Sequence, residues 1–336
     1  MGRESCQKKT SIGGQALIEG IMMRGPHKSV MANRRHDGSI TVEDVASASL
    51  AKRPVLRWPI IRGAVSLIES MILGYRVTML SAERAGMLDE EAPQQDAPAE
   101  EAEAAEAAEP APEEEKKDNT ALMAILGVVS GVLGVALAVF LFMYLPSFLF
   151  KLLNGAVAVD LEPVRAAFEG VLKVLLFLGY LIAVSQMKDI KRVFRYHGAE
   201  HKSIFCYEKG LPLTVENVRE QKRFHPRCGT SFLVLMLLVS ILFYSLILLI
   251  PAVRAFAQTT WLWALIKLVM LPVIVGFGYE LIKFCGRHDN WFTRVVSAPG
   301  MWVQRITTKE PEDEMIEVAI AALEAVIPAN GEDDRW

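Results

Sequence analysis

Residues 231–250 read SFLVLMLLVSILFYSLILLI, an apolar stretch without a single charged residue. A second stretch of this kind, ALMAILGVVSGVLGVALAVFLFMYL at residues 121–145, lies in the uncharged interval between Asp118 and Lys151. Each stretch reaches the roughly 20 apolar residues that a helix needs to cross the ~30 Å hydrocarbon core of a bilayer. Both are therefore predicted to be transmembrane helices, which places the chain among the membrane proteins.

Two further apolar stretches each carry two charged residues and are weaker candidates: 166–187, with Glu169 and Lys173, and 259–282, with Lys267 and Glu280. Glu169 and Lys173 are four residues apart, so a helix brings them onto one face, where they can pair. With 52% hydrophobic residues among 336, the chain is more apolar than a typical soluble protein. The predicted fold is an α-helical membrane protein with about four transmembrane helices in residues 119–285.

Basic residues are distributed unevenly among the segments that connect the predicted spans. The segment between the second and third spans carries most of them: Lys188, Lys191, Arg192, Arg195, Lys202, Lys209, Arg219, Lys222, Arg223 and Arg227. The connections on the other side carry only Lys151, Arg165 and Arg254. Because Lys and Arg are enriched on the cytoplasmic side of membrane proteins, this segment and both termini are expected there.

Residues 1–87 are predicted to form a small cytoplasmic α+β domain. Asp37-Gly38 is a favoured two-residue turn between roughly alternating residues in SVMANRRHDGSITVEDV (29–45), which predicts a β-hairpin. In IIRGAVSLIESMILGYRVTMLSAER (60–84), five charged residues interrupt apolar residues at helical spacing. This segment has too many charges for a span and predicts an amphipathic helix that lies on the membrane or on the bundle.

Residues 88–118 are rich in Ala, Glu and Pro and predict a disordered linker, because such a segment cannot bury a core. Thirteen acidic residues and two Lys lie in 89–118, so the rest of the chain is net positive although the whole has a charge of −3. A positive remainder suits a protein that lies against an anionic inner leaflet. Residues 286–336 are expected to be a cytoplasmic C-terminal segment with a short acidic helix near 311–326.

The stretch His197-Gly-Ala-Glu-His201 follows the second predicted span and has metal-ligand spacing. Residues i and i+4 share one face of a helix, and H-x-x-E-H is the inverted zincin pattern, in which two His bind zinc and Glu200 is the general base. His225-Pro-Arg-Cys228, just before the third span, supplies two more side chains that zinc prefers. The predicted metal ligands are His197, His201, His225 and Cys228, and the predicted catalytic residue is Glu200. No site for an organic cofactor is expected.

Three readings of these residues remain open. A catalytic site needs a third protein ligand and an open position for water, and the candidates for that ligand are Glu208, Glu216, His225, Cys228, Glu280 and His288. In a closed structural site, both pairs bind one ion and clamp the loop 188–228 onto the second and third spans. Without a metal, the two His cap a helix or pair with phosphate. The second span is expected to continue as one helix to about residue 206.

The Gly-rich N-terminal stretch contains two charged residues whose role the sequence leaves open. Its glycines indicate tight turns or close backbone approach. If the stretch folds over the cytoplasmic end of the bundle, Glu19 and Arg24 can complete the site from outside the ligand set. Equally, the two can form a local ion pair in a turn.

Three stretches resemble the YqhQ family of bacterial inner-membrane proteins: GGQALIEGIMMRGP (13–26), YHGAEHKSIFCYEKG (196–210) and RFHPRCGTSF (223–232). The resemblance extends over nearly the whole chain outside the acidic linker. It implies a multi-pass protein of the bacterial cytoplasmic membrane with a domain of unknown function, commonly labelled a predicted metal-dependent enzyme. The predicted site residues lie within the family's polar motifs. The resemblance implies neither a substrate nor a reaction.

Two functions from different classes fit these observations. The first is a zinc-dependent membrane hydrolase that acts at the cytoplasmic face. The second is a non-enzymatic membrane scaffold or assembly factor in which the same residues form a structural metal clasp. The expected partners are the lipid bilayer and a cytoplasmic protein, with no specific nucleic acid. A channel or transporter fits less well, because the predicted spans carry few charges.

Overall fold

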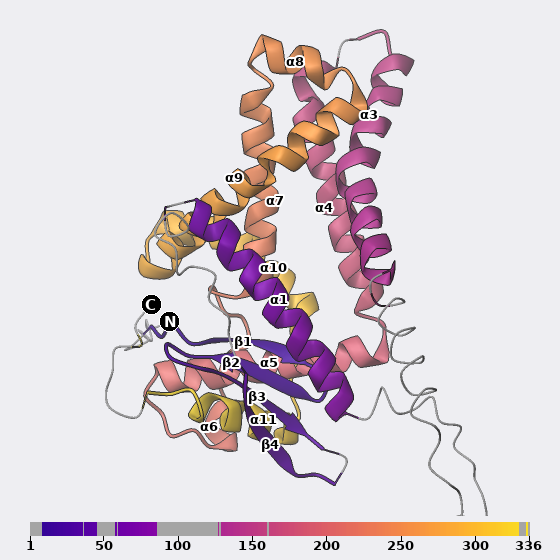
Figure 1. The fold of residues 1–336 in the computed structure, drawn as a ribbon. Coiled ribbons are helices and arrows are strands. Elements are labelled where there is room, and N and C mark those ends of the chain that lie inside the picture. The colour runs from indigo at the N-terminus through magenta and orange to yellow at the C-terminus, as the bar shows by residue number, and fades with distance from the viewer. Residues whose placement is uncertain are drawn as a thin grey trace, which may run out of the picture.

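The computed structural model describes residues 9–35, 37–45, 58, 60–85, 127, 129–159, 161–328 and 334. The predicted linker at 88–118 and residues 121–126 of the first predicted span lie outside them. Figure 1 shows a bundle of long helices at one end of the molecule and a small sheet with shorter helices at the other.

The N-terminal part of the chain forms a four-stranded antiparallel sheet in the order β1-β2-β3-β4. The strands are β1 (Gly13–Leu17), β2 (Gly20–Arg24), β3 (Ser29–Arg34) and β4 (Ile40–Val45). The predicted hairpin around Asp37-Gly38 is confirmed as β3–β4, with Arg34 opposite Ile40. The prediction missed the β1–β2 hairpin, whose turn places Glu19 at a φ of 50°. The Gly-rich stretch is thus half of the sheet.

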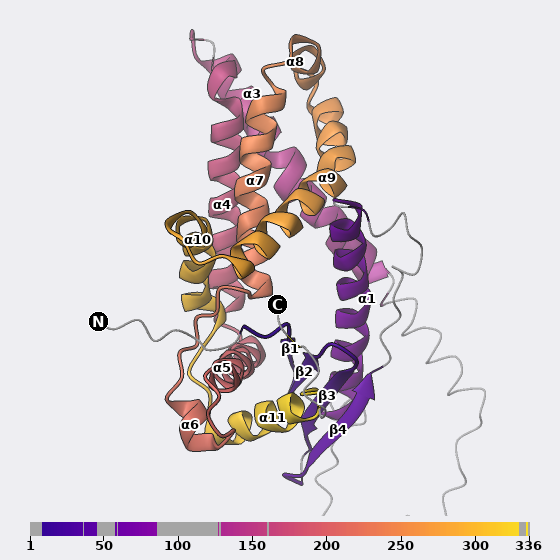
Figure 2. The same ribbon diagram turned by 90° about the vertical axis from the view of Figure 1, so that its left-hand side faces the viewer.

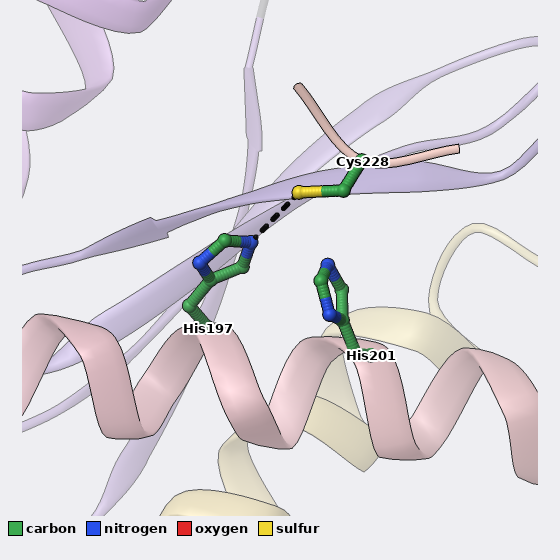
Figure 3. Close-up of side chains that lie close together, drawn as sticks. All are labelled: His197, His201 and Cys228. Carbon is green, nitrogen blue, oxygen red and sulfur yellow. Dashed lines mark hydrogen bonds between the residues drawn. The ribbon is translucent and has the colours of Figure 1, made fainter. Parts of the chain in front are cut away.

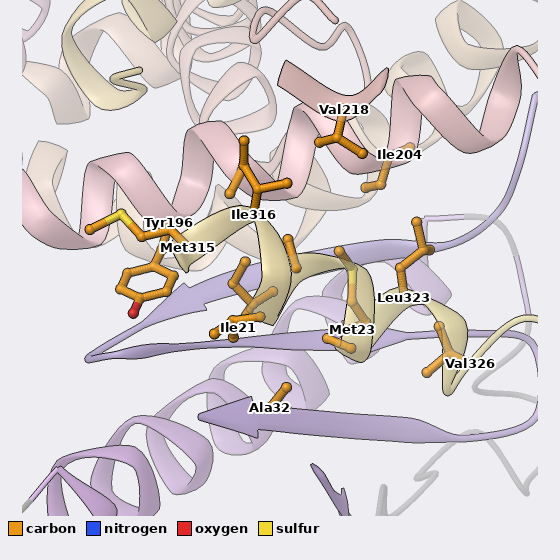
Figure 4. Close-up of a cluster of buried hydrophobic side chains, with 14 of the residues drawn as sticks. Ile21, Met23, Ala32, Tyr196, Ile204, Val218, Met315, Ile316, Leu323 and Val326 are labelled. Carbon is orange, nitrogen blue, oxygen red and sulfur yellow. The ribbon is translucent and has the colours of Figure 1, made fainter. Parts of the chain in front are cut away.

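Side chains on the two central strands alternate between two apolar layers, as the period of a strand requires. Ile21 and Met23 join a core with the helices α5 (Lys188–Glu208) and α11 (Asp313–Glu324), which Figure 4 shows. Met22 and Met31 point to the other face, where Leu73 and Val77 of α1 (Ile61–Arg84) cover them. The sheet therefore lies between α1 on one side and α5 with α11 on the other (Figure 2).

Among the described residues, five helices are long and apolar enough to cross a membrane. They are α1; a helix at Val129–Ala156 that contains the π-helical η3 (Phe140–Tyr144) and α3 (Leu145–Ala156); η4 (Glu162–Val164) with α4 (Arg165–Val184); α7 (Gly229–Ile247); and α9 (Thr260–Arg287). The short α8 (Pro251–Ala257) and the α3–α4 connection lie at the end of the bundle far from the sheet (Figure 1).

The predicted count of about four spans needs a correction, because α1 meets the same criteria of length and composition. Arg62, near its start, forms an ion pair with Glu280 of α9, and Glu83 and Arg84 lie in its last turn, whereas Glu69 and Arg76 lie further inside the helix. Its first turn packs closely on α9, where a side chain at Gly63 would collide with Gly276 and Tyr279. The helix was predicted correctly at residues 60–84, but its charges were given too much weight.

The second predicted span does not continue as one helix. α4 ends at Val184, Ser185 is its C-cap, and α5 begins at Lys188 after Met187 adopts an extended conformation. The break lets α5 turn out of the bundle and lie beneath the sheet, together with α6 (Val215–Arg219) (Figures 1 and 2). The two predicted site histidines therefore belong to the smaller layer and not to a span.

A charged cluster made by Arg165, Glu169 and Lys267 is buried between α3, α4 and α9. Glu169 accepts hydrogen bonds from Arg165 Nε (3.0 Å), from Trp263 Nε1 (3.2 Å) and from Lys267 Nζ. Lys267, which is fully buried, also donates to Ser147 (2.7 Å). The carboxylate thus has a partner on each oxygen, and the cluster ties three helices together.

Lys173, which the spacing allows to pair with Glu169, lies near an aromatic ring. Its Nζ is 5.4 Å from the centre of the Tyr244 ring on α7. Arg165, one turn before Glu169 on the other side, is the closer helical neighbour of the carboxylate. The i,i+4 spacing was a correct guide to pairing, but it applied in the opposite direction along the helix.

The C-terminal segment adds one helix to the bundle and one to the sheet layer. α10 (Trp291–Thr307) packs on the start of α7, where a side chain at Gly300 would collide with Ser231. α11 then closes the core over β2 and β3. The predicted acidic helix near 311–326 is confirmed, and it packs against the N-terminal sheet.

Candidate functional site

Three of the predicted residues bring their donor atoms together. His197 and His201 lie one turn apart on α5, and Cys228 is the N-cap of α7. One donor atom from each of them lies within 4.8 Å of the other two. Figure 3 shows both rings rising from the same face of α5 toward the sulfur. The predicted helical face is therefore confirmed.

Both imidazole rings form hydrogen bonds with backbone carbonyl oxygens through Nδ1. His197 Nδ1 donates to the carbonyl oxygen of Thr307 (2.8 Å), and His201 Nδ1 donates to that of Arg223 (2.5 Å). Because a carbonyl oxygen only accepts, Nδ1 carries the proton in each ring. The Nε2 atoms are then the ones presented to Cys228, and this is how metal-binding His side chains are usually oriented.

The Nε2 atoms and the sulfur differ in how far they are satisfied. His197 Nε2 lies 3.1 Å from Cys228 Sγ, and the Thr230 hydroxyl lies 3.1 Å from the same sulfur. His201 Nε2 is buried and has no hydrogen-bond partner in the described part of the chain. A buried polar atom without a partner is costly, so this nitrogen points to a missing ligand.

The Cys228 thiol and the nearby imidazole of His197 shift each other's pKa. Burial alone would raise the pKa of Cys228, but the positive charges of His197 and His201 lower it well below its ordinary value. Burial alone would likewise lower the pKa of His197, but the Cys228 thiolate and the Glu200 carboxylate raise it to about 9. The thiolate is the form of cysteine that binds metals.

Glu200 lies beside this group and has one free oxygen. Its Oε1 accepts a hydrogen bond from the backbone N–H of Gly14 on β1 (3.0 Å), whereas its buried Oε2 has no partner among the described residues. Burial raises the pKa of Glu200 above its ordinary value, although the nearby histidines oppose that shift. The approach of β1 is close, since a side chain at Gly14 would touch the Glu200 carboxyl carbon.

The Gly-rich stretch thus reaches the site through its backbone. Its two charged residues, whose role was left open, are apart from each other. Glu19 accepts hydrogen bonds from Arg192 and from the Tyr196 hydroxyl on α5, whereas Arg24 lines the pocket around the site. Neither forms the local ion pair with the other that one reading predicted. Glu19 anchors the β1–β2 turn to α5.

A cavity of about 630 Å³ surrounds the donor atoms. Its polar lining includes His197, Glu200, His201 and Cys228, and the remaining lining comes from β1 and the residues before it, β2, α1, the rest of α5, the loop before Cys228 and the first turns of α7. A volume of this size is within the range of small-molecule sites. The three donors therefore face open space and not a sealed core.

His225, the fourth predicted ligand, lines the same cavity but is not part of the group of three. Its ring centre is 5.5 Å from that of His201, while its Nε2 lies 3.7 Å from Glu208 Oε2. Burial, together with the charge of Arg227, lowers the pKa of His225 to about 4. His225 is therefore a neutral, buried ring that packs beside the donors, and its role as a ligand stays a prediction.

The remaining third-ligand candidates are not part of the group of three either. Glu208 forms an ion pair with Arg227, and Glu280 forms one with Arg62. The His288 ring stacks on Phe284, and Glu216 lies on the short α6. Of the candidates named from the sequence, Cys228 is the one that meets the two histidines.

Sequence reasoning missed Gln304 of α10, a fully buried side chain that holds the loop before Cys228. Its Oε1 accepts from the backbone N–H of His225, and its Nε2 donates to the His225 carbonyl and to Ser231 (2.7, 2.7 and 2.8 Å). All three contacts join residues far apart in the chain, so no local pattern indicated them. The same is true of the carbonyls of Thr307 and Arg223.

Comparison with known proteins places these motifs in a family. A family model described as "Protein of unknown function (DUF1385)" matches residues 58–329. The chain belongs to this family. It is also 36% identical over 317 residues to the uncharacterized protein YqhQ of Bacillus subtilis (strain 168), which covers 94% of this chain and 92% of that protein. The resemblance to YqhQ is confirmed. No solved structure matches the chain.

Proposed function

We propose that this DUF1385 protein is a multi-pass protein of the bacterial cytoplasmic membrane. It binds one zinc ion through His197, His201 and Cys228 and catalyses a hydrolysis at the cytoplasmic face. The membrane assignment is supported by five helices of sufficient length and apolarity. Both termini are cytoplasmic in this proposal, because the basic segment around α5 lies on the side of the sheet.

The convergence of the three donors carries the metal proposal. Zinc–nitrogen and zinc–sulfur bonds of about 2.0 and 2.3 Å at tetrahedral angles place ligand atoms roughly 3.3 to 3.6 Å apart. The 3.1 Å between His197 Nε2 and Cys228 Sγ is close to that spacing, and the remaining pairs lie within 4.8 Å. A zinc ion would also give the unpartnered Nε2 of His201 a partner.

His197, His201 and Cys228 would hold a zinc ion beside the cavity and leave room for a water ligand. Such an ion would supply a Lewis acid and lower the pKa of the bound water to about 7. The free Oε2 of Glu200 accepts a proton in the cavity, and the Gly14 N–H holds the other carboxylate oxygen in place. Glu200 is therefore the general base of the proposed reaction.

The proposal is tested by the metal content of detergent-purified protein, measured by mass spectrometry. We expect about one zinc per chain in the wild type and in Glu200→Gln, and none in His201→Ala. His288→Ala, which changes an exposed histidine outside the group, is the matched control and keeps the metal. A folded wild type without bound metal would rule out the zinc site.

A second function, a structural clasp in a membrane scaffold, is favoured by the origin of the ligands. His197 and His201 belong to α5, whereas Cys228 precedes α7, so an ion would join the sheet layer to the bundle. The basic segment and the sheet would then recruit a cytoplasmic protein. A clasp predicts that chelation lowers the melting temperature markedly and that Glu200→Gln changes nothing. A hydrolase predicts that Glu200→Gln abolishes turnover while the metal remains.

A further inference from the structure

The walls of the site cavity come from two different parts of the molecule. Gly13 to Ala16 of β1 and the residues of α5 form one side, and Gly229, Thr230 and Leu233 of α7 form the other. Ser70 and Leu73 of α1 close it laterally. Since α1 and α7 are two of the five candidate spans, the cavity lies at the junction between the sheet layer and the bundle.

Polar and apolar groups both line this cavity. The zinc donors and Glu200 lie where α5 meets Cys228, and Leu73 of α1 and Leu233 of α7 are among the apolar side chains of the lining. Leu233, on the first turns of α7, is 49% exposed and stands at the opening. A cavity lined by apolar side chains with a few polar groups is typical of a site for a molecule that carries groups of both kinds.

Both helices that line the cavity also carry exposed apolar side chains. On α1, those near Ser70 are Ile68, Met71, Ile72 and Tyr75, and on α7 they include Leu238 and Leu242. In a membrane, such side chains contact lipid chains. Because residues of the same two helices line the cavity, a lipid beside these helices lies close to the zinc donors.

We infer that the substrate is a membrane-resident amphiphile: its polar group reaches the zinc site, and its alkyl chain leaves between α1 and α7 into the bilayer. This inference rests on the proposed zinc site. The cavity of about 630 Å³ accommodates a polar group and the first part of one chain, and the bilayer solvates the rest. Hydrolysis then adds water across a bond near the polar group and releases two products, of which one keeps the chain.

The test uses hydroxamic acids, which bind zinc and cobalt through two oxygens, as probes of different chain length. Cobalt-loaded protein in phosphatidylcholine vesicles is titrated with acetohydroxamic acid and with dodecanohydroxamic acid, and the visible absorption of cobalt reports binding. If the cavity opens to the bilayer, the vesicles concentrate the long probe at the opening. Half-saturation then needs about tenfold less total dodecanohydroxamic acid than acetohydroxamic acid.

A cavity that opens to water reverses the order, because the vesicles then withdraw the long probe from the site; that result overturns the inference. If neither probe alters the cobalt spectrum, or if no cobalt binds, the proposed zinc site itself fails. A hydrophobic peptidyl hydroxamate that binds more tightly than the alkyl probe overturns the lipid class in favour of a peptide substrate.

Leu233→Gln places a polar group at the opening and supplies a test on the residue itself. We expect it to raise half-saturation for dodecanohydroxamic acid about tenfold and to leave that for acetohydroxamic acid unchanged, which also shows that the site is folded. Leu246→Gln, at an exposed position near the other end of α7, is the matched control. If the two variants bind the probes equally well, Leu233 does not contact the alkyl chain of the ligand.

Discussion

The charged cluster in the bundle and the donor group at α5 are both buried and polar, but they differ in how they are satisfied. In the charged cluster, each oxygen of Glu169 accepts hydrogen bonds from basic or indole groups. In the donor group, Glu200 Oε2 and His201 Nε2 have no partner among the described residues.

The difference separates a structural role from a binding role. A buried charge is tolerated when it is paired and hydrogen-bonded, and the charged cluster meets that condition within the chain. The donor group does not meet it without a ligand. A polar cluster that is complete holds helices together, whereas an incomplete one is arranged for something that the chain itself does not contain.

The largest effect is expected from Glu169→Leu. Without the carboxylate, Lys267 remains buried without its counter-charge and Arg165 keeps the more distant Glu162 (3.6 Å), which costs about 3–5 kcal/mol of unfolding free energy. Thermal unfolding in detergent measures the loss, and Asp44→Asn, at an exposed acid, is the control. The double variant Glu169→Leu with Lys267→Met should recover part of the stability. If Glu169→Leu alone were as stable as the wild type, the charged cluster would not have the structural role that distinguishes it from the donor group.

Gln304→Leu should have the next largest effect. It leaves the N–H and carbonyl of His225 without partners and costs about 2–4 kcal/mol. Because this loop places Cys228, zinc affinity should also fall by about tenfold. Chemical unfolding and competition with a chelator measure the two effects, and Gln186→Leu, at an exposed glutamine, is the control. If only stability changed, Gln304 would support the fold without positioning the ligand.

A variant of His225 tests whether this residue belongs to the donor group. Its pKa is lowered by burial to about 4, below the unfolded value of about 6.5, so the unfolded chain binds more protons between these pH values. Metal-free protein should therefore lose on the order of 2–3 kcal/mol as the pH falls from 6.5 to 4. His225→Asn should flatten this slope and keep the zinc. Loss of zinc in this variant would instead support the closed four-ligand site.

Glu200→Gln should have the smallest effect on stability, below about 1 kcal/mol, because the amide oxygen still accepts from Gly14 and the shape is unchanged. Turnover of a hydrolase should nevertheless disappear while zinc stays bound. Metal analysis beside thermal unfolding checks both expectations. A stability loss as large as that of Glu169→Leu would contradict the claim that the second oxygen of Glu200 lacks a partner.

Patterns within one element predicted much of the fold and part of the site. The apolar stretches predicted α4, α7 and α9, the Asp37-Gly38 turn predicted β3–β4, and the i,i+4 spacing predicted the shared face of His197 and His201. Contacts between distant segments were not predictable in this way. Nothing local links Gly14 to Glu200, Thr307 to His197, or Gln304 to His225, and the orientation of His225 depends on Glu208 and Arg227.

The position of α11 has a consequence for how the protein is made. β4 ends at Val45, and the helix that covers β2 and β3 begins at Asp313, so a ribosome needs roughly a quarter of a minute to a minute to synthesise the chain between them. During that time, the face of the sheet formed by β2 and β3 has no covering helix. Thr307, whose carbonyl orients His197, also emerges late. Nascent chains that stop before Thr307 would carry both histidines and the cysteine yet lack the contact that orients His197, so the donor group is complete only when synthesis is nearly finished.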